Sequence, residues 1–189
     1  MSTLKTNAIQ TTGGKPLLHS TGSILQVVST HKGDWFQTNS TSWTDITGLT
    51  CSIQPSNSGN KILVWCSMGA AGTRQSNGDH GNGIRTYRQI GGGSWSTDNK
   101  CNGVGTGGRE PATYKGNGWS YNADHMPGGL GFHALDNPAT TSNVTYKIQV
   151  KCQSSSHRFT LNGNDNNGAG SEVYRCRHIT SLTLMEVSA

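Results

Sequence analysis

The stretch that decides the fold is VTYKIQVKC, residues 144–152. Every even-numbered position in it is apolar or aromatic, whereas Thr145, Lys147, Gln149 and Lys151 occupy the odd-numbered positions. Successive side chains of a β-strand point to opposite faces, so this alternation directs the even positions to a core and the odd positions to water. The stretch is therefore predicted to be a strand of a sheet with one face covered.

Strand patterns continue on both sides of this stretch. The run KILVWCSM, residues 61–68, is the most apolar of the chain, and its short length and β-branched and aromatic members favour a central strand over a helix. Residues 24–28 are apolar on both faces, which predicts a strand covered on two sides. Residues 42–46 and 49–53 are predicted to be a strand pair joined by a turn at Thr47-Gly48. Further strands are predicted over 84–90, 130–135, 158–161 and 175–187.

These patterns favour an all-β fold. No segment combines a helix cap with a 3.6-residue apolar stripe, so no crossover helices are expected. Roughly eight to ten strands without such helices predict an antiparallel β-sandwich of the jelly-roll kind. Its loops are expected to be long and rich in glycine, because 17 of the 26 glycines lie between Gly69 and Gly131.

The chain is expected to consist of an arm and one domain. Residues 1–21 are polar and broken by Gly13-Gly14, so this N-terminal arm cannot bury itself and is predicted to bind a partner chain. Residues 22–189 form the predicted β-sandwich domain. Hydrophobic residues make up only 31% of the sequence, which favours subunits that associate and bury one another's surface. The apolar residues with which the arm would contact its partners are Leu4, Ile9, Leu17 and Leu18.

Composition argues against several functional classes. The net charge of +5 comes from fifteen Lys and Arg residues that form no long basic run, so nucleic-acid binding is not expected. No apolar stretch approaches the length that a bilayer requires, and the chain starts without a secretory signal, so membrane insertion and export by that route are not expected. The five cysteines lack zinc-ligand spacing; Cys51, Cys66, Cys152 and Cys176 fall in predicted strands and are interpreted as buried or half-buried thiols.

An enzyme is also not expected. The sequence contains no GxSxG, HExxH or GxxxxGK[ST] motif. A glycosidase needs two carboxylates across a sugar, but Asp79, Asp98, Glu110 and Asp124 lie on separate glycine-rich segments. The polar run at 78–83 could hold a cation, but it is interpreted as a polar turn. The run at 162–172 lacks the register of a calcium loop. No metal or cofactor is therefore predicted, and a polysaccharide-degrading enzyme remains a less favoured alternative.

Binding residues are sought among the aromatic residues of the glycine-rich region. Aromatic side chains exposed on loops commonly stack against sugar rings or contact another protein. An equally strong alternative is that they close one end of the sandwich or a seam between subunits. The candidates are Trp95, Trp119, Tyr121 and Tyr114.

Several segments carry a family resemblance. LKTNAIQTTGGKPLLHSTGSILQVV, residues 4–28, resembles the start of many fibre-like and other structural proteins of marine and freshwater tailed bacteriophages, cyanophages especially. The loops from about 70 to 128 match no family. The other matching segments, in the same order, are SWTDITGL (42–49), NKILV (60–64), LDNPATT (135–141), VTYKIQ (144–149) and LTLMEV (182–187).

The resemblance implies a virion structural protein that is made in the host cytoplasm and forms a homotrimer. Its arm would attach to other virion proteins, and its β domain would face outward. The first functional hypothesis is a tail fibre or spike component that contacts a polysaccharide or protein of the host surface. The alternative is a capsid decoration or cement protein, a head fibre. The resemblance implies no catalytic residues.

Overall fold

A computed structural model describes residues 21–75, 81–116, 118–120, 128–164 and 176–189. These residues contain twelve β-strands and no helix, and so no helix long and apolar enough to span a membrane. The predicted arm residues Leu4, Ile9, Leu17 and Leu18 lie outside the described residues. The strands are β1 (Ile24–Lys32), β2 (Phe36–Thr38), β3 (Thr44–Ile53), β4 (Lys61–Met68), β5 (Ala71–Gln75), β6 (Asn82–Ile90), β7 (Tyr114–Gly116), β8 (Gly118–Ser120), β9 (Leu130–Asp136), β10 (Val144–Cys152), β11 (Arg158–Leu161) and β12 (Thr180–Val187).

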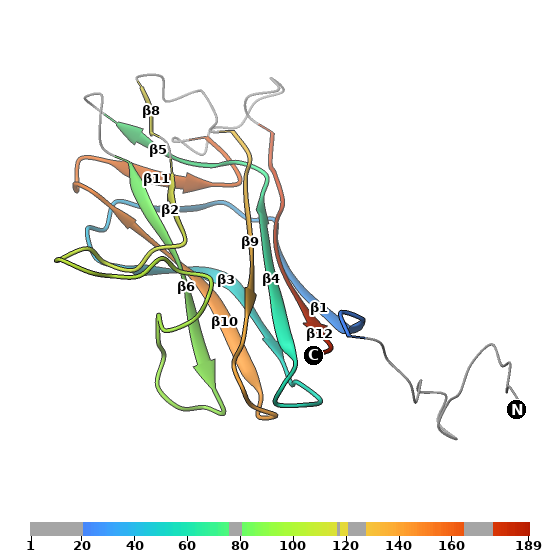
Figure 1. Ribbon diagram of the computed structural model, residues 1–189. Helices are drawn as coiled ribbons and strands as arrows, with labels where there is room; N and C mark the ends of the chain where they lie inside the picture. The colour runs from blue at the N-terminus through green and yellow to red at the C-terminus, as the bar shows by residue number, and fades with distance from the viewer. Residues whose placement is uncertain (1–20, 76–80, 117, 121–127, 165–175) are drawn as a thin grey trace, which may run out of the picture.

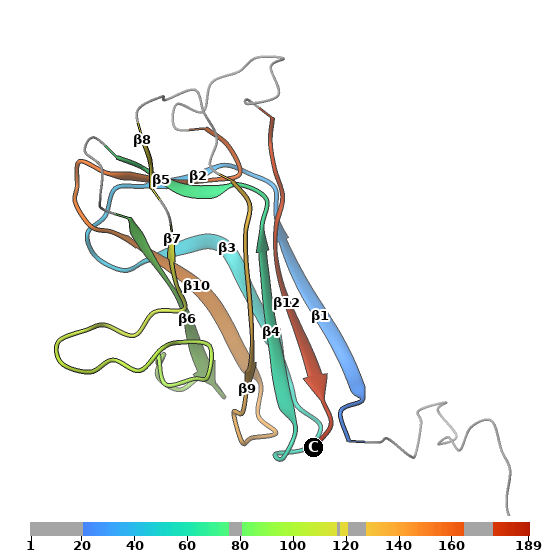
Figure 2. The ribbon, with the colours of Figure 1, turned by 45° about the horizontal axis from the view of Figure 1, so that its top comes forward.

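The strands form three four-stranded sheets that pack together (Figures 1 and 2). One sheet has the order β1-β12-β4-β9 and a second has the order β3-β10-β6-β7. The third, β2-β11-β5-β8, runs across the upper end of the other two in Figure 1 and contains one parallel pair, β5 with β8. The predicted antiparallel β-sandwich is confirmed, whereas its jelly-roll connectivity stays a prediction.

The core lies between the first two sheets. Val64 and Leu184 of one sheet and Ile148 of the other are fully buried, and Phe159 and Leu161 of β11 close the upper end. Burial of such side chains contributes about 1.5–3 kcal/mol each to folding. The core therefore joins the three sheets and leaves one outer face on each of the two long sheets.

The predicted register of residues 144–152 is confirmed. Val144, Tyr146, Ile148, Val150 and Cys152 are buried, and the lysines between them lie on the other face of β10. That face carries the candidate site.

The predicted strand pair over 42–53 is wrong, because β3 is one strand. Lys147 of β10 pairs with Thr50, but Gln149 pairs with Asp45, so β3 has extra residues between these two pairs. Gly48 has a φ of 82°, a conformation that glycine adopts readily. Thr47-Gly48 therefore forms a bulge in a continuous strand and not a hairpin turn.

The prediction that residues 24–28 are covered on both faces is also wrong for this chain. β1 is an edge strand, paired with β12 on one side, and Ile24 and Val27 are 56% and 54% exposed. Only residues or chains outside the described part of the structure could cover the second face of this strand.

Four of the five cysteines are buried thiols. Cys51, Cys66 and Cys152 lie in strands as predicted. Cys176 does not: it is exposed and precedes β12, which begins at Thr180. Cys101 is buried although it lies in a loop, and burial raises the pKa of the Cys66 and Cys101 thiols to about 12.

A buried carboxylate fastens the lower end of the sandwich. Glu186 of β12 is 1% exposed and accepts hydrogen bonds from Gln26 Nε2 at 2.6 Å, the Ser56 backbone N–H at 2.6 Å and Asn60 Nδ2 at 2.6 Å. Burial acts to raise the pKa of Glu186, but the hydrogen bonds from these three residues outweigh it and the pKa lies below its ordinary value. The carboxylate thus joins β1, β12 and the β3–β4 loop.

This arrangement predicts a pH-dependent contribution to stability. Because the pKa is lower in the folded state, the carboxylate stabilises the fold above its unfolded pKa near 4.3, and that stabilisation is lost as the pH falls through the folded value. We expect Glu186→Gln to lower the free energy of unfolding at pH 7 by about 1–3 kcal/mol. Denaturant titrations should show the difference from wild type narrowing below about pH 4. A difference that stays constant down to pH 2 would contradict this account. Asp98→Asn, at an exposed aspartate of the loop that follows β6, is the control.

Candidate functional site

The outer face of the β3-β10-β6-β7 sheet alternates cations and aromatic rings. Lys147 and Gln149 of β10 lie opposite Tyr87 and Arg85 of β6. Residues paired directly across antiparallel strands project on the same face. With two tryptophans that lie over the sheet and one further lysine, these side chains form what we call the cationic aromatic face: Trp43, Arg85, Tyr87, Trp95, Lys147 and Lys151.

Cation–π contacts order this face. The Arg85 guanidinium carbon lies 4.4 Å from the Trp43 ring centroid and 4.7 Å from that of Tyr87. Lys147 Nζ lies 4.1 Å from the Trp95 centroid, and the Tyr87 and Trp95 rings stack with centroids 5.7 Å apart. Contacts of this kind contribute about 0.5–1 kcal/mol each at exposed sites. They hold long side chains in place, so these side chains lose less conformational entropy when a ligand binds.

Asp45 holds the centre of the face. Its carboxylate accepts hydrogen bonds from Lys147 Nζ at 2.7 Å and Gln149 Nε2 at 2.6 Å, and Gln149 Oε1 in turn accepts one from Arg85 Nε at 2.7 Å. Burial acts to raise the pKa of Asp45, but the hydrogen bonds from Lys147 and Gln149 bring it below its ordinary value. The face therefore carries fixed charges of both signs at neutral pH.

A pocket of about 590 Å³ lies beside Trp43, a size typical of small-molecule sites. Glu110 at its wall accepts hydrogen bonds from Lys151 Nζ at 2.8 Å and Trp43 Nε1 at 3.0 Å. The hydrogen bond from Lys151 is the main reason that the pKa of Glu110 is lowered. The pocket is lined by Trp43, Gly81, Asn82, Gly83, Arg109, Glu110, Ala112, Tyr114, Lys115, Lys151, Cys152 and Gln153.

Gly83 allows Trp43 to lie at this position. A Cβ atom on Gly83 would lie 2.9 Å from Cη2 of the Trp43 ring, closer than such atoms approach. The missing side chain thus makes room for the indole over β6. One glycine of the strand therefore positions an aromatic wall of the pocket.

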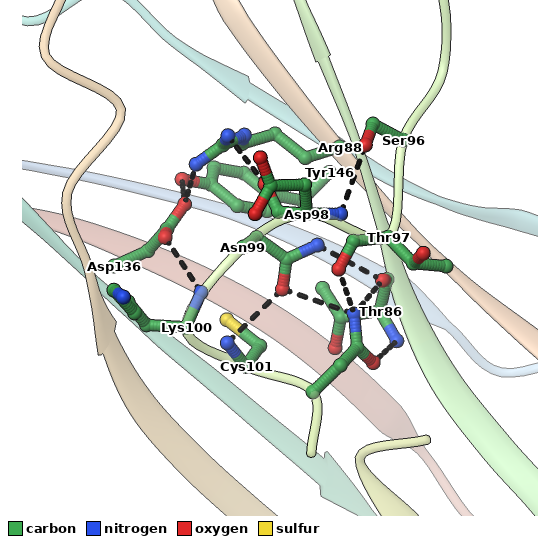
Figure 3. A network of polar contacts seen from close by, with 11 residues as sticks. Thr86, Arg88, Ser96, Thr97, Asp98, Asn99, Lys100, Cys101, Asp136 and Tyr146 are labelled. Atoms are coloured by element: carbon green, nitrogen blue, oxygen red, sulfur yellow. Dashed lines mark hydrogen bonds and ion pairs between the residues drawn. The ribbon is translucent and has the colours of Figure 1, made fainter. Parts of the chain in front are cut away.

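Trp95 and Glu110 both come from the loop 91–113, which is held by the buried carboxylate of Asp136 (Figure 3). Asp136 Oδ2 lies 2.7 Å from Arg88 Nη1 and accepts a hydrogen bond from the Tyr146 hydroxyl at 2.7 Å. Asp136 Oδ1 accepts the backbone N–H of Lys100 at 2.9 Å. Burial, together with the Asp136 carboxylate, raises the pKa of Tyr146, so its hydroxyl keeps its proton and donates. One carboxylate thus joins the two long sheets to the loop.

Two asparagines of the same loop continue the network. Asn102 Nδ2 donates to the backbone oxygens of Thr86 at 2.7 Å and Thr97 at 3.1 Å, and Asn99 Nδ2 donates to Thr86 O at 3.2 Å. Backbone hydrogen bonds of 2.9 and 2.8 Å pair Arg88 with Ser96. These bonds fix the segment that follows Trp95, residues 96–102, against β6 (Figure 3).

The outer face of the other long sheet carries an apolar patch. Val27, Met185, Leu63 and Leu135 lie side by side across β1, β12, β4 and β9. Val27 and Leu135 are 54% and 44% exposed. In the neighbouring row Trp65 is 50% exposed and contacts the His133 ring. We call these six residues the apolar face. Ser29, Thr183 and Lys61 project on the same side of the sheet and border it.

The structure brings two of the four candidate aromatic residues to the site. Trp95 lies on the cationic aromatic face, and Tyr114 lines the pocket. The backbone of Trp119 lies in β8, but its side chain and the whole of Tyr121 lie outside the described residues. The sequence analysis missed Trp43, Arg85, Tyr87, Lys147 and Lys151, although their outward positions followed from the strand alternation.

The carboxylates considered for an enzyme have separate roles. Glu110 lines the pocket, whereas Asp98 enters the loop network through its backbone oxygen, which accepts a hydrogen bond from Arg88 Nη2 at 2.5 Å. Asp79 and Asp124 lie outside the described residues. Within the described ranges, no three His, Cys, Asp or Glu side chains gather as metal ligands would.

Comparisons of the chain with protein-family models and with curated proteins found no match.

Removal of the Asp136 charge should loosen the loop. In Asp136→Asn, Arg88 keeps a buried guanidinium without its partner, so we expect the free energy of unfolding to fall by about 3–5 kcal/mol. Trp95 should also become more mobile, because the loop that carries it loses its anchor. Thermal melts and the fluorescence anisotropy of a variant retaining only Trp95 would measure the two effects.

The matched control is Asp98→Asn, which changes an aspartate of the same loop but leaves the backbone oxygen that Arg88 uses. Its free energy of unfolding should lie within about 0.5 kcal/mol of the wild-type value. Equal destabilisation by the two substitutions would show that the Asp136 carboxylate does not anchor the loop.

Proposed function

We propose that the chain is a non-enzymatic structural protein of a tailed-phage virion. It forms a homotrimer through its apolar face and presents its cationic aromatic face to the host surface, as a tail fibre or spike component. The observation that carries this proposal is the difference between the two outer faces of one sandwich. One face carries a partly exposed apolar patch across four strands, and the other carries ordered cations and aromatic rings.

The chemistry of the apolar face favours a second copy of the chain as its partner. Closed symmetric assemblies bring identical surfaces together around an axis, so a charge near the axis meets its own copies. None of the six residues of the apolar face carries a permanent charge, so its centre avoids that repulsion. Lys61 lies at the border of the face, two residues before Leu63. Large exposed apolar patches also favour burial in an interface. The low hydrophobic content, 31%, is consistent with a subunit that gains stability from association.

The cationic aromatic face is suited to contact with a partner of mixed polarity. Tryptophan, tyrosine and arginine are the residues that contribute most at binding surfaces, and here all three occur together. A trimer would offer three copies of this face, and multivalency raises the overall affinity for a surface with many receptors. Weak single contacts would then suffice for host attachment.

Adsorption measurements test the two parts of the proposal together. We expect the purified chain to have the mass of a trimer by light scattering and to block adsorption of the phage to its host cells. Val27→Glu adds a charge to an exposed position, so it should leave a folded monomer that blocks adsorption about 100-fold less well, because multivalency is lost. Antibodies to the chain should label the tail of intact particles in electron micrographs.

Thr50→Glu is the control, since it adds the same charge to an exposed position of the opposite long sheet. It should remain a trimer. A wild-type monomer, or a trimer that Val27→Glu leaves intact, would refute assembly through the apolar face. Failure of the wild-type trimer to block adsorption would refute host contact, and antibody label on the head would assign the chain to capsid decoration instead.

A further inference from the structure

We propose that the pocket beside Trp43 binds an acidic sugar unit of a polysaccharide. This inference rests on the proposed host-contact function, because it specifies the chemistry of the partner that the cationic aromatic face meets. The polysaccharide would continue from the pocket along the face toward Trp95. Two observations carry the inference: the two donors that hold the Glu110 carboxylate at the pocket wall, and the balance of charges and rings in the lining.

Glu110 shows which donors the pocket offers to an anion. Its carboxylate accepts from the Lys151 ammonium at 2.8 Å and from the Trp43 indole N–H at 3.0 Å. The Glu110 side chain is 53% exposed and belongs to the loop 91–113, so the pair is accessible from solvent. A ligand carboxylate or sulfate beside Glu110 would accept a hydrogen bond from Lys151, because an ammonium has three N–H bonds to give.

The lining as a whole favours an anionic sugar over a neutral one. Arg109, Lys115 and Lys151 supply three positive charges against the single negative charge of Glu110. Trp43 and Tyr114 supply aromatic surface against which the C–H face of a sugar ring packs. The Glu110 carboxylate offers an acceptor for ring hydroxyls. Size, charge and hydrogen-bonding groups therefore all fit one acidic saccharide.

The same face is less suited to a nucleic acid. A single strand needs several free rings on which successive bases stack, but Tyr87 and Trp95 stack on each other and Lys147 lies over the Trp95 ring. The carboxylates of Asp45 and Glu110 would also lie near the phosphate of each nucleotide. In a polysaccharide whose acidic groups are spaced apart, fewer negative charges would lie beside these carboxylates.

Calorimetric titrations of the purified full chain test the proposal. The acidic probes are defined oligomers of galacturonate, mannuronate and sulfated dextran; unsulfated dextran of equal length is the neutral probe, and oligothymidine is the nucleic-acid probe. We expect one or more acidic glycans to bind at least about tenfold more tightly than dextran and oligothymidine. The acidic probe that binds most tightly shows whether the natural ligand is carboxylated or sulfated.

Three substitutions locate the binding in the pocket. Lys151→Gln should weaken binding of that glycan about tenfold, because it loses a charge-assisted hydrogen bond. Gly83→Ala should weaken it as well, since the added Cβ displaces only the Trp43 ring. Glu110→Gln should instead strengthen binding about threefold, because it removes the negative charge nearest the ligand.

The matched control is Lys100→Gln, which removes one positive charge from an exposed residue that contributes its backbone N–H to the Asp136 network. It should leave the affinity within about twofold of wild type. An equal loss in Lys100→Gln and Lys151→Gln would show that net charge alone attracts the glycan and would overturn the site. So would weaker binding in Glu110→Gln, a preference for oligothymidine, or equal binding of dextran and all acidic probes.

These outcomes are separable from those of the proposed function. A trimer that blocks phage adsorption but binds no acidic glycan refutes the inference and leaves host contact intact. A chain that binds the glycan through Lys151 but does not affect adsorption keeps the sugar site and refutes the proposed function.

Discussion

The carboxylate of Asp136 is the constraint on which the outer surface of this protein depends. It lies 2.7 Å from both the Arg88 guanidinium and the Tyr146 hydroxyl, and it accepts the backbone N–H of Lys100. A buried carboxylate is costly unless each of its oxygens is paired, and here both are. Because the partners come from β6, β10 and the loop 91–113, satisfying the carboxylate fixes the loop relative to both long sheets.

The consequences of this anchor reach both parts of the candidate site. On one side of the site, the loop 91–113 places Trp95 against Tyr87 and Lys147. On the other side, it places Glu110 against Lys151 and Trp43. A glycine-rich loop of this length would otherwise have a large entropy to lose on binding. The polar network holds it in advance, so the pocket and the cationic aromatic face are formed before any ligand arrives. Opposite them, the apolar face is available for assembly.

The sequence predicted the scaffold better than the site. Alternation in VTYKIQVKC predicted which side chains of β10 face the core, because an apolar residue at every second position indicates a β-strand with one buried face. Bulge formation at Gly48 and the exposure of Val27 were missed, since strand neighbours and sheet edges depend on pairing across long sequence separations. For the same reason, the composition of the glycine-rich region indicated Trp95 and Tyr114 as binding residues but could not predict the contact between Arg85 and Trp43. Trp43 lies 42 residues earlier in the sequence than Arg85.

Amide hydrogen exchange at Lys100 tests the central role of Asp136 most directly. The Lys100 N–H is a loop amide whose acceptor is a buried carboxylate, so the account predicts that it exchanges as slowly as the strand amides of β6 and β10. It should also speed up together with the Thr86 and Ser96 amides when Asp136 is replaced by asparagine. A Lys100 amide that exchanges as fast as the exposed loop amides at 105–108 would contradict the account, because the loop would then not be held by this carboxylate.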